Sequence, residues 1–375
     1  MIISQITLLN FRNHKKRNFS FSPDLTIVVG KNTSGKTNLM EAVYLLSTAR
    51  SFRHGRDYQT ITFNREMARI KGLVGTDDET KELEITLTRG EVTGIKTPLK
   101  KFTINGVSKR SIDFVGILPS VLFWPEDMEL VTGSPTIRRH YLDSVLIQID
   151  REYRRTLNSY ERALRQRNKL LEAIRENQAD RQQLLFWDQL LIKQGNYLTG
   201  KREEFISSVN ETELPALLKT GAKYMLYYDK SIISHLRFDQ LRPAEIASAV
   251  TLVGPHRDDM IFKIRNPDIK SEENETEFEN QNNYKDLSLY GSRGEQRLAV
   301  LWLKLSELRY MQKETGERAV LLLDDIFSEL DHEHREIIFK ILPDQQSILT
   351  VTDKHLIPEE RFRQAKVIEL SGEYE

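Results

Sequence analysis

The feature that most constrains this chain is an eight-residue motif near its amino terminus, Gly30-Lys31-Asn32-Thr33-Ser34-Gly35-Lys36-Thr37. The motif satisfies the pattern G-x-x-x-x-G-K-[ST] in full, and it stands between the apolar run LTIVV and the amphipathic stretch NLMEAVYLL. In a strand–loop–helix context the glycines let successive backbone N–H groups curl around a phosphate, and the helix points its positive end at the anion. We therefore predict that all eight residues bind ATP. Lys36 would reach the β- and γ-phosphates, and the Thr37 hydroxyl would bind Mg²⁺.

Composition narrows the class of protein further. The 375 residues include no Cys, which excludes a disulfide framework, a Cys-ligated zinc site, an iron–sulfur cluster and thiol catalysis. The 55 basic and 55 acidic residues cancel, so any nucleic-acid contact must come from a local basic patch. No apolar run approaches the ~18 residues of a membrane-spanning helix. The start MIISQITLLNF lacks the pattern of a secretory signal. We expect a cytoplasmic protein with no membrane partner.

A second motif near the carboxyl end completes the expected nucleotide site. Five apolar residues, Ala319 to Leu323, are followed by Asp324 and Asp325. A buried strand that delivers carboxylates at its carboxyl end is how a phosphate-loop fold holds Mg²⁺. We predict that Asp324 is the metal partner, through water, and that Asp325 polarises the attacking water. Together with Lys36 they form the expected catalytic set. Taken alone, the pattern also fits a strand that ends in a polar turn.

The order of apolar patterns predicts an α/β fold with an inserted helical lobe. Residues 1–130 read as mixed strands and loops, with a hairpin at 69–87 and a surface loop around 90–101. Strands then alternate with helices near the carboxyl end, which suggests a parallel sheet. That segment contains a helix at about 292–313, a strand at 319–323, a helix at about 332–341 and a strand at 347–351.

Residues 136–210 change character, because no Gly or Pro occurs between Pro135 and Gly195 and apolar residues recur at steps of three and four. One stripe runs from Leu142 to Leu164, which predicts a helix or a pair of helices of about 40 residues, roughly 60 Å long. A second helix is expected near 180–209, after a turn around Asn177 to Asp180. The acidic, Asn-rich stretch 266–286 is interpreted as a mobile surface insertion. The expected domains are 1–130, 131–248 for the arm, and 249–375.

Basic residues gather on one face of this predicted arm. At 100° per residue, five of them fall within roughly ±40° of one direction, and the apolar stripe points about 180° away. They are Arg151, Arg155, Arg162, Arg165 and Lys169. The face suits a polyanion such as DNA, and it also fits an ordinary solvated surface. A smaller cluster follows the phosphate-loop helix and either couples DNA to nucleotide or is a solvated turn; it comprises Arg50, Arg53, His54 and Arg56.

A third motif precedes the acidic strand. Ser292-Arg293-Gly294-Glu295-Gln296 opens a helix, with Ser292 as its expected N-cap. Followed by the paired acids and by Ser328 to Asp331, this series resembles the signature, Walker B and D-loop motifs of ABC-type ATPases. The resemblance implies that the signature of one subunit caps the γ-phosphate held by another, and that Ser328 and Asp331 belong to the D-loop. ATP would then join two copies head to tail.

Further motifs occur in order along nearly the whole chain and resemble the RecF family of bacterial recombination mediators, which is related to SMC-type heads. They are Asn10-Phe11-Arg12-Asn13, Phe123-Trp124-Pro125-Glu126-Asp127, Gly133-Ser134-Pro135 with Arg138-Arg139, and Gly254-Pro255-His256-Arg257-Asp258-Asp259. The resemblance implies an ABC-type head with a mixed β-lobe and an inserted α-helical arm, and it places Arg12 and Asn13 near the adenine and phosphates. It also implies roles in replication, recombination and the SOS response. The implied partners are gapped duplex and single-stranded DNA, RecO and RecR, in the loading of RecA.

Departures from the wider ABC pattern predict slow hydrolysis. Asp325 stands where transporter-type domains usually carry Glu, and Thr352 and Asp353 stand where a His is common. We therefore expect a weak, DNA-stimulated ATPase that acts as a timing switch. The short segment from Gly254 to Asp259 is assigned a structural or nucleotide-coupled role, because it offers too few ligands for a metal.

Other classes of ATPase fit the sequence less well. A transporter subunit would have a much shorter separation than the 262 positions between Gly30 and Ser292, and it would carry a Gln that FWPED lacks. A fused nuclease has too little room, because 44 residues follow Asp331. A metabolic phosphate-loop kinase leaves the motif at Ser292 unexplained. The nucleotide-binding subunit of another assembly, a transporter or an SMC-like complex, stays the alternative.

Overall fold

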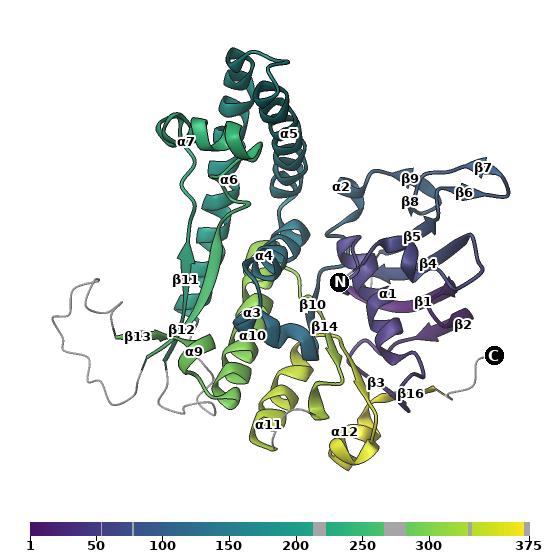
Figure 1. Ribbon diagram of the computed structural model, residues 1–375. Coiled ribbons are helices and arrows are strands. Elements are labelled where there is room, and N and C mark those ends of the chain that lie inside the picture. The colour runs from purple at the N-terminus through teal and green to yellow at the C-terminus, as the bar shows by residue number, and fades with distance from the viewer. Residues whose placement is uncertain (54, 77–78, 213–222, 266–282, 329–331, 371–375) are drawn as a thin grey trace. The chain divides into compact units, whose positions relative to one another are not determined.

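The chain forms two compact units, described here separately (Figure 1). The computed structural model describes all residues except 54, 77–78, 213–222, 266–282, 329–331 and 371–375. The first unit comprises Met1–Asp127 and Glu307–Glu375, and the second comprises Met128–Ser306. The compact units place residues 249–306 with the arm, whereas the sequence-based division places them with the head. The division into functional domains stays a prediction.

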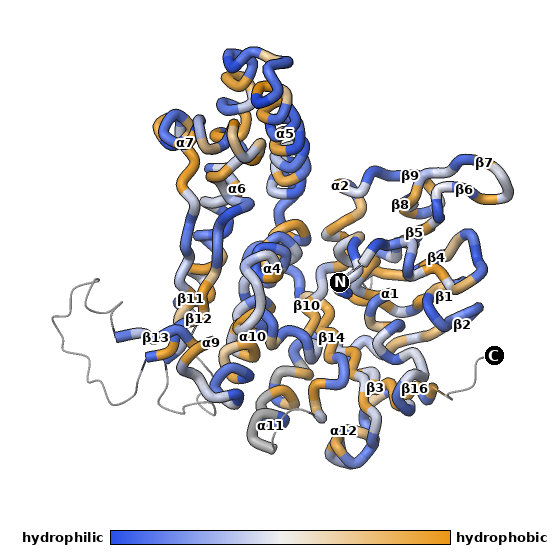
Figure 2. The backbone as a smooth tube through the Cα atoms, in the orientation of Figure 1, coloured by the Kyte–Doolittle hydropathy of each residue, from blue (hydrophilic) through white to orange (hydrophobic). Residues whose placement is uncertain are grey.

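A parallel sheet forms the core of the first unit. Its strands, in spatial order, are β10 (Ser120–Phe123), β14 (Val320–Asp324), β15 (Ser347–Val351), β3 (Leu25–Gly30) and β16 (Lys366–Leu370). Every residue of β14 and β15 is buried, because elements cover both faces of such a sheet. Figure 2 shows β14 as hydrophobic. The strands predicted at 319–323 and 347–351 are thereby confirmed to within one residue.

A second, antiparallel sheet lies in the same unit. It consists of β2 (His14–Ser20), β1 (Ile2–Phe11), β4 (Met67–Gly75), β5 (Thr80–Thr88), β8 (Lys100–Ile104) and β9 (Val107–Lys109). The predicted hairpin at 69–87 is confirmed as β4 and β5. The surface loop predicted around 90–101 contains a short hairpin, in which β6 (Glu91–Val92) pairs with β7 (Ile95–Lys96). Helix α1 (Lys36–Thr48) contacts strands of both sheets, which explains why almost all of its residues are buried.

Long helices dominate the second unit. They are α4 (Pro135–Ile149), α5 (Arg151–Arg175), α6 (Leu184–Glu211) and α7 (His235–Ser248), and α5 packs along α6 (Figure 1). The apolar stripe predicted from Leu142 to Leu164 belongs to two helices, because Asp150 ends α4 and caps α5 by accepting a hydrogen bond from the Tyr153 amide at 2.9 Å. The turn expected around Asn177 to Asp180 is confirmed.

A small antiparallel sheet completes the second unit, with strands β11 (Lys223–Asp229), β12 (Asp259–Arg265) and β13 (Tyr284–Asp286). Strand β13 lies within the predicted acidic insertion, whereas residues 266–282 of that insertion lie outside the described part of the chain. Towards the carboxyl end come α9 (Leu287–Tyr290), α10 (Arg293–Thr315), α11 (His332–Ile341) and α12 (Glu359–Gln364). Two single-turn helices, α2 (Ser111–Phe114) and α3 (Glu129–Thr132), precede the arm, and 3-10 turns occupy 57–60, 125–128, 181–183, 326–328, 342–344 and 354–356.

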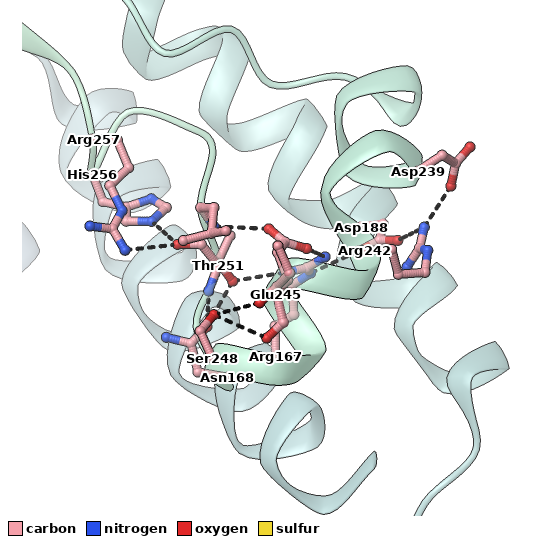
Figure 3. Close-up of polar contacts among 12 residues, drawn as sticks. Arg167, Asn168, Asp188, Asp239, Arg242, Glu245, Ser248, Thr251, His256 and Arg257 are labelled. Carbon is pink, nitrogen blue, oxygen red and sulfur yellow. Dashed lines mark hydrogen bonds and ion pairs between the residues drawn. The ribbon is translucent and has the colours of Figure 1, made fainter. Parts of the chain in front are cut away.

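An arginine at the centre of the second unit joins three helices. The Arg167 side chain, on α5, is completely buried and donates to Asp188 on α6 at 2.8 Å and to Glu245 on α7 at 2.7 Å (Figure 3). It also donates to the Thr251 hydroxyl at 2.9 Å, and its guanidinium lies 4.2 Å from the ring centroid of Phe238. Burying a charge is tolerated only when it is paired and hydrogen-bonded, and Arg167 meets both conditions.

Candidate functional site

The predicted phosphate loop connects β3 to α1 in the first unit. Gly35 has a φ of 101°, and a Cβ at this position would lie 2.8 Å from the Asn13 side chain. A Cβ on Gly30 would lie 2.5 Å from the Ser34 hydroxyl oxygen. Gly35 is therefore required by its left-handed backbone as well as by close packing, and Gly30 by close packing.

Two side chains inside the loop are suited to receive an anion. The Lys36 ammonium is buried and donates to the backbone carbonyls of Gly30 at 2.6 Å and Lys31 at 3.1 Å. Burial lowers the pKa of Lys36, while Asp325 and Asp324 act in the opposite direction. The Ser34 hydroxyl is also buried and has no hydrogen-bond partner within the described chain. A buried hydroxyl without a partner is costly, and a phosphate oxygen would supply one.

The acidic strand end lies beside this loop. Asp324 is the last residue of β14 and is buried; it accepts a hydrogen bond from the Thr350 hydroxyl at 2.7 Å. Burial raises the pKa of Asp324, and hydrogen bonds from Thr350 and Thr37 partly oppose that shift. The structure thus brings Thr37 and Asp324 together. Thr350 on β15 was not identified from the sequence, although a polar residue within the apolar run SILTV was a signal that could have revealed it.

Asp325 follows in a strained backbone conformation, with a φ of 52°. Its amide donates to the Thr350 hydroxyl at 2.9 Å, so one threonine holds both acidic residues. The Ser328 hydroxyl donates to the Asp325 carbonyl at 2.7 Å and so fixes the turn after the strand. A non-glycine residue at positive φ persists only where its surroundings hold it there. The predicted D-loop residue Asp331 lies outside the described residues.

The turn between β1 and β2 packs against the phosphate loop. The Asn13 amide donates to the Thr33 carbonyl at 3.4 Å, and its oxygen accepts from Asn38 at 2.8 Å. Buried His14 has its Nε2 at 3.2 Å from the Gly35 carbonyl, and burial lowers the pKa of this histidine. Asn13 therefore lies at the loop, as the resemblance implied. The contribution of His14 was missed, since nothing in its spacing marks it.

One buried carboxylate organises the arginines around α1. Glu41 is completely buried and pairs with Arg12 through two hydrogen bonds, of 2.6 and 2.9 Å. Arg53 donates to Asn38 at 2.9 Å and reaches Glu41 at 3.5 Å. Arg53, a predicted DNA contact, thus lies against the phosphate-loop helix, whereas Arg56 is exposed on a neighbouring turn. Glu41 was missed, although an acidic residue within NLMEAVYLL signals a buried ion pair.

The signature residues lie in the second unit, at the start of α10. The Ser292 hydroxyl and amide each lie 2.8 Å from a Glu295 carboxylate oxygen, and the Glu295 amide donates back to Ser292 at 3.3 Å. This reciprocal arrangement is a capping box. Buried Gln296 donates to the carbonyls of Leu287 and Gly291, at 3.2 and 3.3 Å, and fixes the preceding turn. Ser292, Arg293 and Gly294 remain exposed.

The basic face predicted on the arm is formed by α5. All five predicted residues are exposed, at positions 151, 155, 162, 165 and 169, whereas Tyr153, Leu157 and Tyr160 are buried. Arg155 lies 3.5 Å from Glu152 in an exposed ion pair, and such a pair contributes little to stability.

Among the residues that the structure describes, no helix combines the length and apolar character needed to cross a membrane.

The geometry of the loop, the acidic strand end and the signature turn agrees with comparisons to known proteins. Residues 2–367 match the family model described as the RecF/RecN/SMC N terminal domain. The chain belongs to this family. It is also 34% identical over 376 residues to the DNA replication and repair protein RecF of Agathobacter rectalis, covering 98% of this chain and 96% of the relative.

Other relatives agree. The chain is 36% identical to the DNA replication and repair protein RecF of Roseiflexus castenholzii, over 94% of this chain and 93% of the relative. It is 32% identical to RecF of Bacillus thuringiensis, over 99% of this chain and 97% of the relative. Within the wider family, the chain therefore groups with RecF.

Solved structures extend the comparison to the fold. The structure of the recombination mediator protein RecF with ATP, in the RecFOR pathway, matches with a TM-score of 0.82 and 31% identity, over 95% of this chain and 93% of that one. An SMC head bound to the C-terminal winged-helix domain of ScpA matches with a TM-score of 0.53 and 16% identity, over 98% of this chain and 94% of that one, which shows a shared fold alone. The predicted fold class, an α/β head of the SMC/RecF type with a long helical insertion, is confirmed.

Proposed function

We propose that this chain is an ATP-controlled DNA-binding protein of recombinational repair and replication. Two copies would close head to tail when each holds ATP, the closed dimer would bind DNA at single-strand/duplex gaps, and slow hydrolysis would release it. The observation that carries the proposal is the assembled phosphate loop, in which the unpartnered Ser34 hydroxyl and the buried Lys36 ammonium lie beside Asp324. Similarity to the RecF–ATP structure supports the same assignment.

The residues present fit ATP and Mg²⁺. Lys36 would exchange two neutral carbonyls for phosphate oxygens, and Ser34 would gain the partner that it lacks. Thr37 and Asp324 already share a hydrogen bond and would hold Mg²⁺, which takes few protein ligands and completes its shell with phosphate oxygens and water. Bound Mg²⁺ would neutralise charge that develops on the phosphates. The described residues include no cluster of three or more carboxylates or histidines suited to another metal.

Hydrolysis would be slow because Asp325 is a short base. Its side chain is one methylene shorter than the Glu of transporter-type domains, and its backbone is held at positive φ by Thr350 and Ser328. We propose that Asp325 orients the attacking water and that the enzyme acts as a timing switch. A turnover near the top of the ~1–10³ s⁻¹ range typical of enzymes would contradict this assignment.

DNA binding is assigned to the exposed basic face of α5, with RecO and RecR as partners through the relationship to RecF. The five basic side chains are spaced along one face of a 25-residue helix, with the buried side opposite. Lys and Arg that neutralise backbone phosphates release counterions, so binding should weaken steeply as salt rises. Arg53 and Arg56 are proposed as secondary contacts that couple DNA to the nucleotide site.

The decisive experiment measures equilibrium binding of the full chain to gapped duplex DNA at one fixed salt concentration, with Mg²⁺, with and without ATP. We expect at least tenfold tighter binding with ATP. Charge reversal of Arg162, Arg165 and Lys169 to Glu should remove most of this affinity. Charge reversal of Arg181, Lys193 and Arg237 to Glu is the matched control, since all three are exposed in the same unit and none lies on α5. Equal binding in both nucleotide states would contradict the switch.

A second variant separates nucleotide binding from dimer formation. Ser292→Arg places a bulky cation at the start of α10, where the signature would receive the partner's γ-phosphate. ATP binding should be unchanged, and ATP-dependent dimerisation, measured by light scattering, should be lost. Thr315→Arg, at the other end of the same helix, is the control. If Ser292→Arg dimerised with ATP like the unmodified chain, the head-to-tail arrangement would be wrong.

A further inference from the structure

Two sequence motifs that the proposed function leaves unused meet in the second unit. One contains Arg138 and Arg139 at the start of α4, and the other is the loop that ends at Asp258 and Asp259 before β12. Arg138 donates two hydrogen bonds to the Asp259 carboxylate, at 2.7 and 2.8 Å. Arg139 donates to the Asp258 carbonyl at 2.7 Å. Residues about 120 positions apart thus form one cluster of charged side chains.

The carboxylates of this cluster are already engaged. Asp259 is taken by Arg138, and buried Arg202 on α6 donates to Asp143 at 2.8 Å and to Asp258 at 3.3 Å. Asp258 also accepts from the Ser231 amide at 2.7 Å and from the Tyr228 hydroxyl. Arg138 and Arg202 therefore have charged partners.

Two further arginines have only neutral acceptors in the described part of the chain. Arg139 donates to the Asp258 carbonyl and to the Thr136 hydroxyl at 3.0 Å, and Arg257 donates to the Thr251 carbonyl at 3.2 Å (Figure 3 shows Arg257). Arg139 is half-buried, and burial lowers its pKa; Arg202 and Arg257 act in the same direction, whereas Asp259 and Asp258 act in the opposite direction. Neighbouring guanidinium groups that hold no carboxylate of their own, one half-buried and one exposed, favour a bound anion.

The carboxylates near Arg139, those of Asp258 and Asp259, are each paired with another arginine, so their negative charge is already compensated. The first turn of α4 contains no acidic residue, and the Ser134 side chain makes no capping hydrogen bond. Between the two arginines, His256 stays neutral at physiological pH, because burial lowers its pKa to about 4. Arg257 is exposed, so one side of the cluster is open to solvent.

This cluster is distinct from the basic face of α5. His256 lies 2.8 Å from the Tyr160 hydroxyl, and Tyr160 projects about 180° away from Arg151 and Lys169 around the helix. The loop that carries Arg257 therefore packs on the buried side of α5. It also belongs to the second unit, whereas the phosphate loop belongs to the first.

We propose that Arg139 and Arg257, with the Thr136 hydroxyl, form a second phosphate-binding subsite. The planar fork of each arginine can donate two parallel hydrogen bonds to phosphate oxygens, which lysine cannot do. The ligand is a phosphate group of a polyphosphate or of a nucleic-acid backbone. The subsite goes beyond the proposed ATP switch and does not depend on it.

The test uses the full chain carrying Lys36→Ala, which weakens the phosphate loop, and inorganic tripolyphosphate as the probe in Mg²⁺-free buffer. Binding is measured by titration calorimetry at fixed salt. Adding Arg139→Gln and Arg257→Gln should weaken tripolyphosphate binding at least tenfold. The control adds Arg181→Gln and Arg237→Gln, which remove the same charge from exposed positions of the same unit and should leave binding unchanged. Equal loss in both double variants, or no loss in either, would overturn the subsite.

A second arm identifies the source of the phosphate. Binding of a blunt DNA duplex without ATP is measured over a range of salt for the same variants. If the subsite takes a DNA phosphate, the arginine pair should reduce the slope of log affinity against log salt by about 1 to 2 relative to the control pair. An unchanged slope together with lost tripolyphosphate binding assigns the subsite to a free polyphosphate or nucleotide.

Two controls distinguish loss of the subsite from misfolding of a variant and from failure of the proposed ATP switch. Arg257→Gln alone, at an exposed position, repeats the test if the Arg139 variant fails to fold, and it should weaken tripolyphosphate binding at least threefold. No change with folded Arg257→Gln would also overturn the subsite. Failure of the ATP switch would appear instead as ATP-independent binding of gapped DNA by the unmodified chain.

Discussion

Two buried cations of this protein, Arg167 in the second unit and Lys36 in the first, are held in opposite ways. In the second unit, Arg167 is completely buried with Asp188 and Glu245 as permanent partners. In the first, buried Lys36 and Ser34 have only neutral carbonyls or no partner, and burial shifts the pKa of Lys36 downward. Charge that is paired within the protein stabilises an arrangement of helices. Charge left without an ionic partner weakens the empty fold and is available to a ligand.

The largest expected effect tests Arg167, the buried cation with carboxylate partners. Arg167→Ala leaves buried Glu245 without its cation and leaves Asp188 with Arg242 alone, so the free energy of unfolding of the second unit should fall by about 3–5 kcal/mol. Urea unfolding followed by circular dichroism measures it. Arg165→Ala, two residues away on the exposed face of the same helix, should change stability by no more than about 0.5 kcal/mol. Equal effects of the two variants would mean that the buried network contributes nothing of its own.

The next effect is the pH dependence of the second unit. Burial lowers the pKa of His256 from 6.5 to about 4, with Arg257, Arg139 and Arg167 adding to the shift. Because the folded pKa is depressed, the stability is fully present above pH 6.5 and is lost as pH falls from 6.5 to about 4. The loss attributable to this histidine is at most about 3 kcal/mol. Unfolding free energies measured across this range should show a shallower slope for His256→Gln. His140→Gln, exposed on α4, should keep the original slope.

A third prediction concerns Lys36, the buried cation that donates only to neutral carbonyls. Lys36→Ala removes the cation from the phosphate loop, so ATP affinity should fall roughly tenfold to a hundredfold, equivalent to about 1.4–2.7 kcal/mol. Stability without nucleotide should be nearly unchanged or slightly higher, because a buried cation with neutral partners is lost. Calorimetric titration and thermal unfolding with and without ATP measure both quantities. Lys16→Ala, exposed on β2 in the same unit and outside the loop, is the control. A large loss of stability without ATP would show that Lys36 is structural.

The smallest effect concerns the acidic strand end. Burial raises the pKa of Asp324, so its contribution to stability is present below the ordinary pKa and is lost as pH rises through the raised value. Asp324→Asn removes that loss and should stabilise the nucleotide-free protein at pH 7 by up to about 1 kcal/mol, with the advantage vanishing near pH 4. ATP hydrolysis should be abolished. Asp344→Asn, exposed in the same unit, should show neither change, and a destabilised Asp324→Asn protein would contradict this account.

The motifs were predictable from sequence because their chemistry demands particular residues. The phosphate loop, the strand that ends at Asp324 and the helix that starts after Ser292 all occur where the sequence predicts them. The residues that contact these motifs from other elements were harder to predict from the sequence. Thr350, Glu41 and His14 contact the loop or the acidic pair from other elements, and no local periodicity specifies such contacts.

In the arm, too, the sequence did not specify contacts between elements. Periodicity identified the exposed basic face of α5, but it left open whether one helix or two carry the apolar stripe, because Asp150 separates α4 from α5 without a Gly or Pro. Arg167 projects about 160° from Arg151, on the apolar side, so a basic residue at that position was itself a signal of buried acidic partners. Which residues would pair with it depends on how α6 and α7 pack, and that follows from tertiary structure alone.

Strand β3 has consequences for how the protein is made. Its two neighbours in the sheet, β15 and β16, are formed by residues 347–351 and 366–370, whereas β3 itself ends at Gly30. A ribosome therefore synthesises the phosphate loop before the second unit, and the strands that flank β3 after it. The second unit, complete at Ser306, emerges earlier and can fold first. A nascent chain that stops short of β15 and β16 leaves both edges of β3 unpaired, so the nucleotide site matures only after the whole second unit has been synthesised.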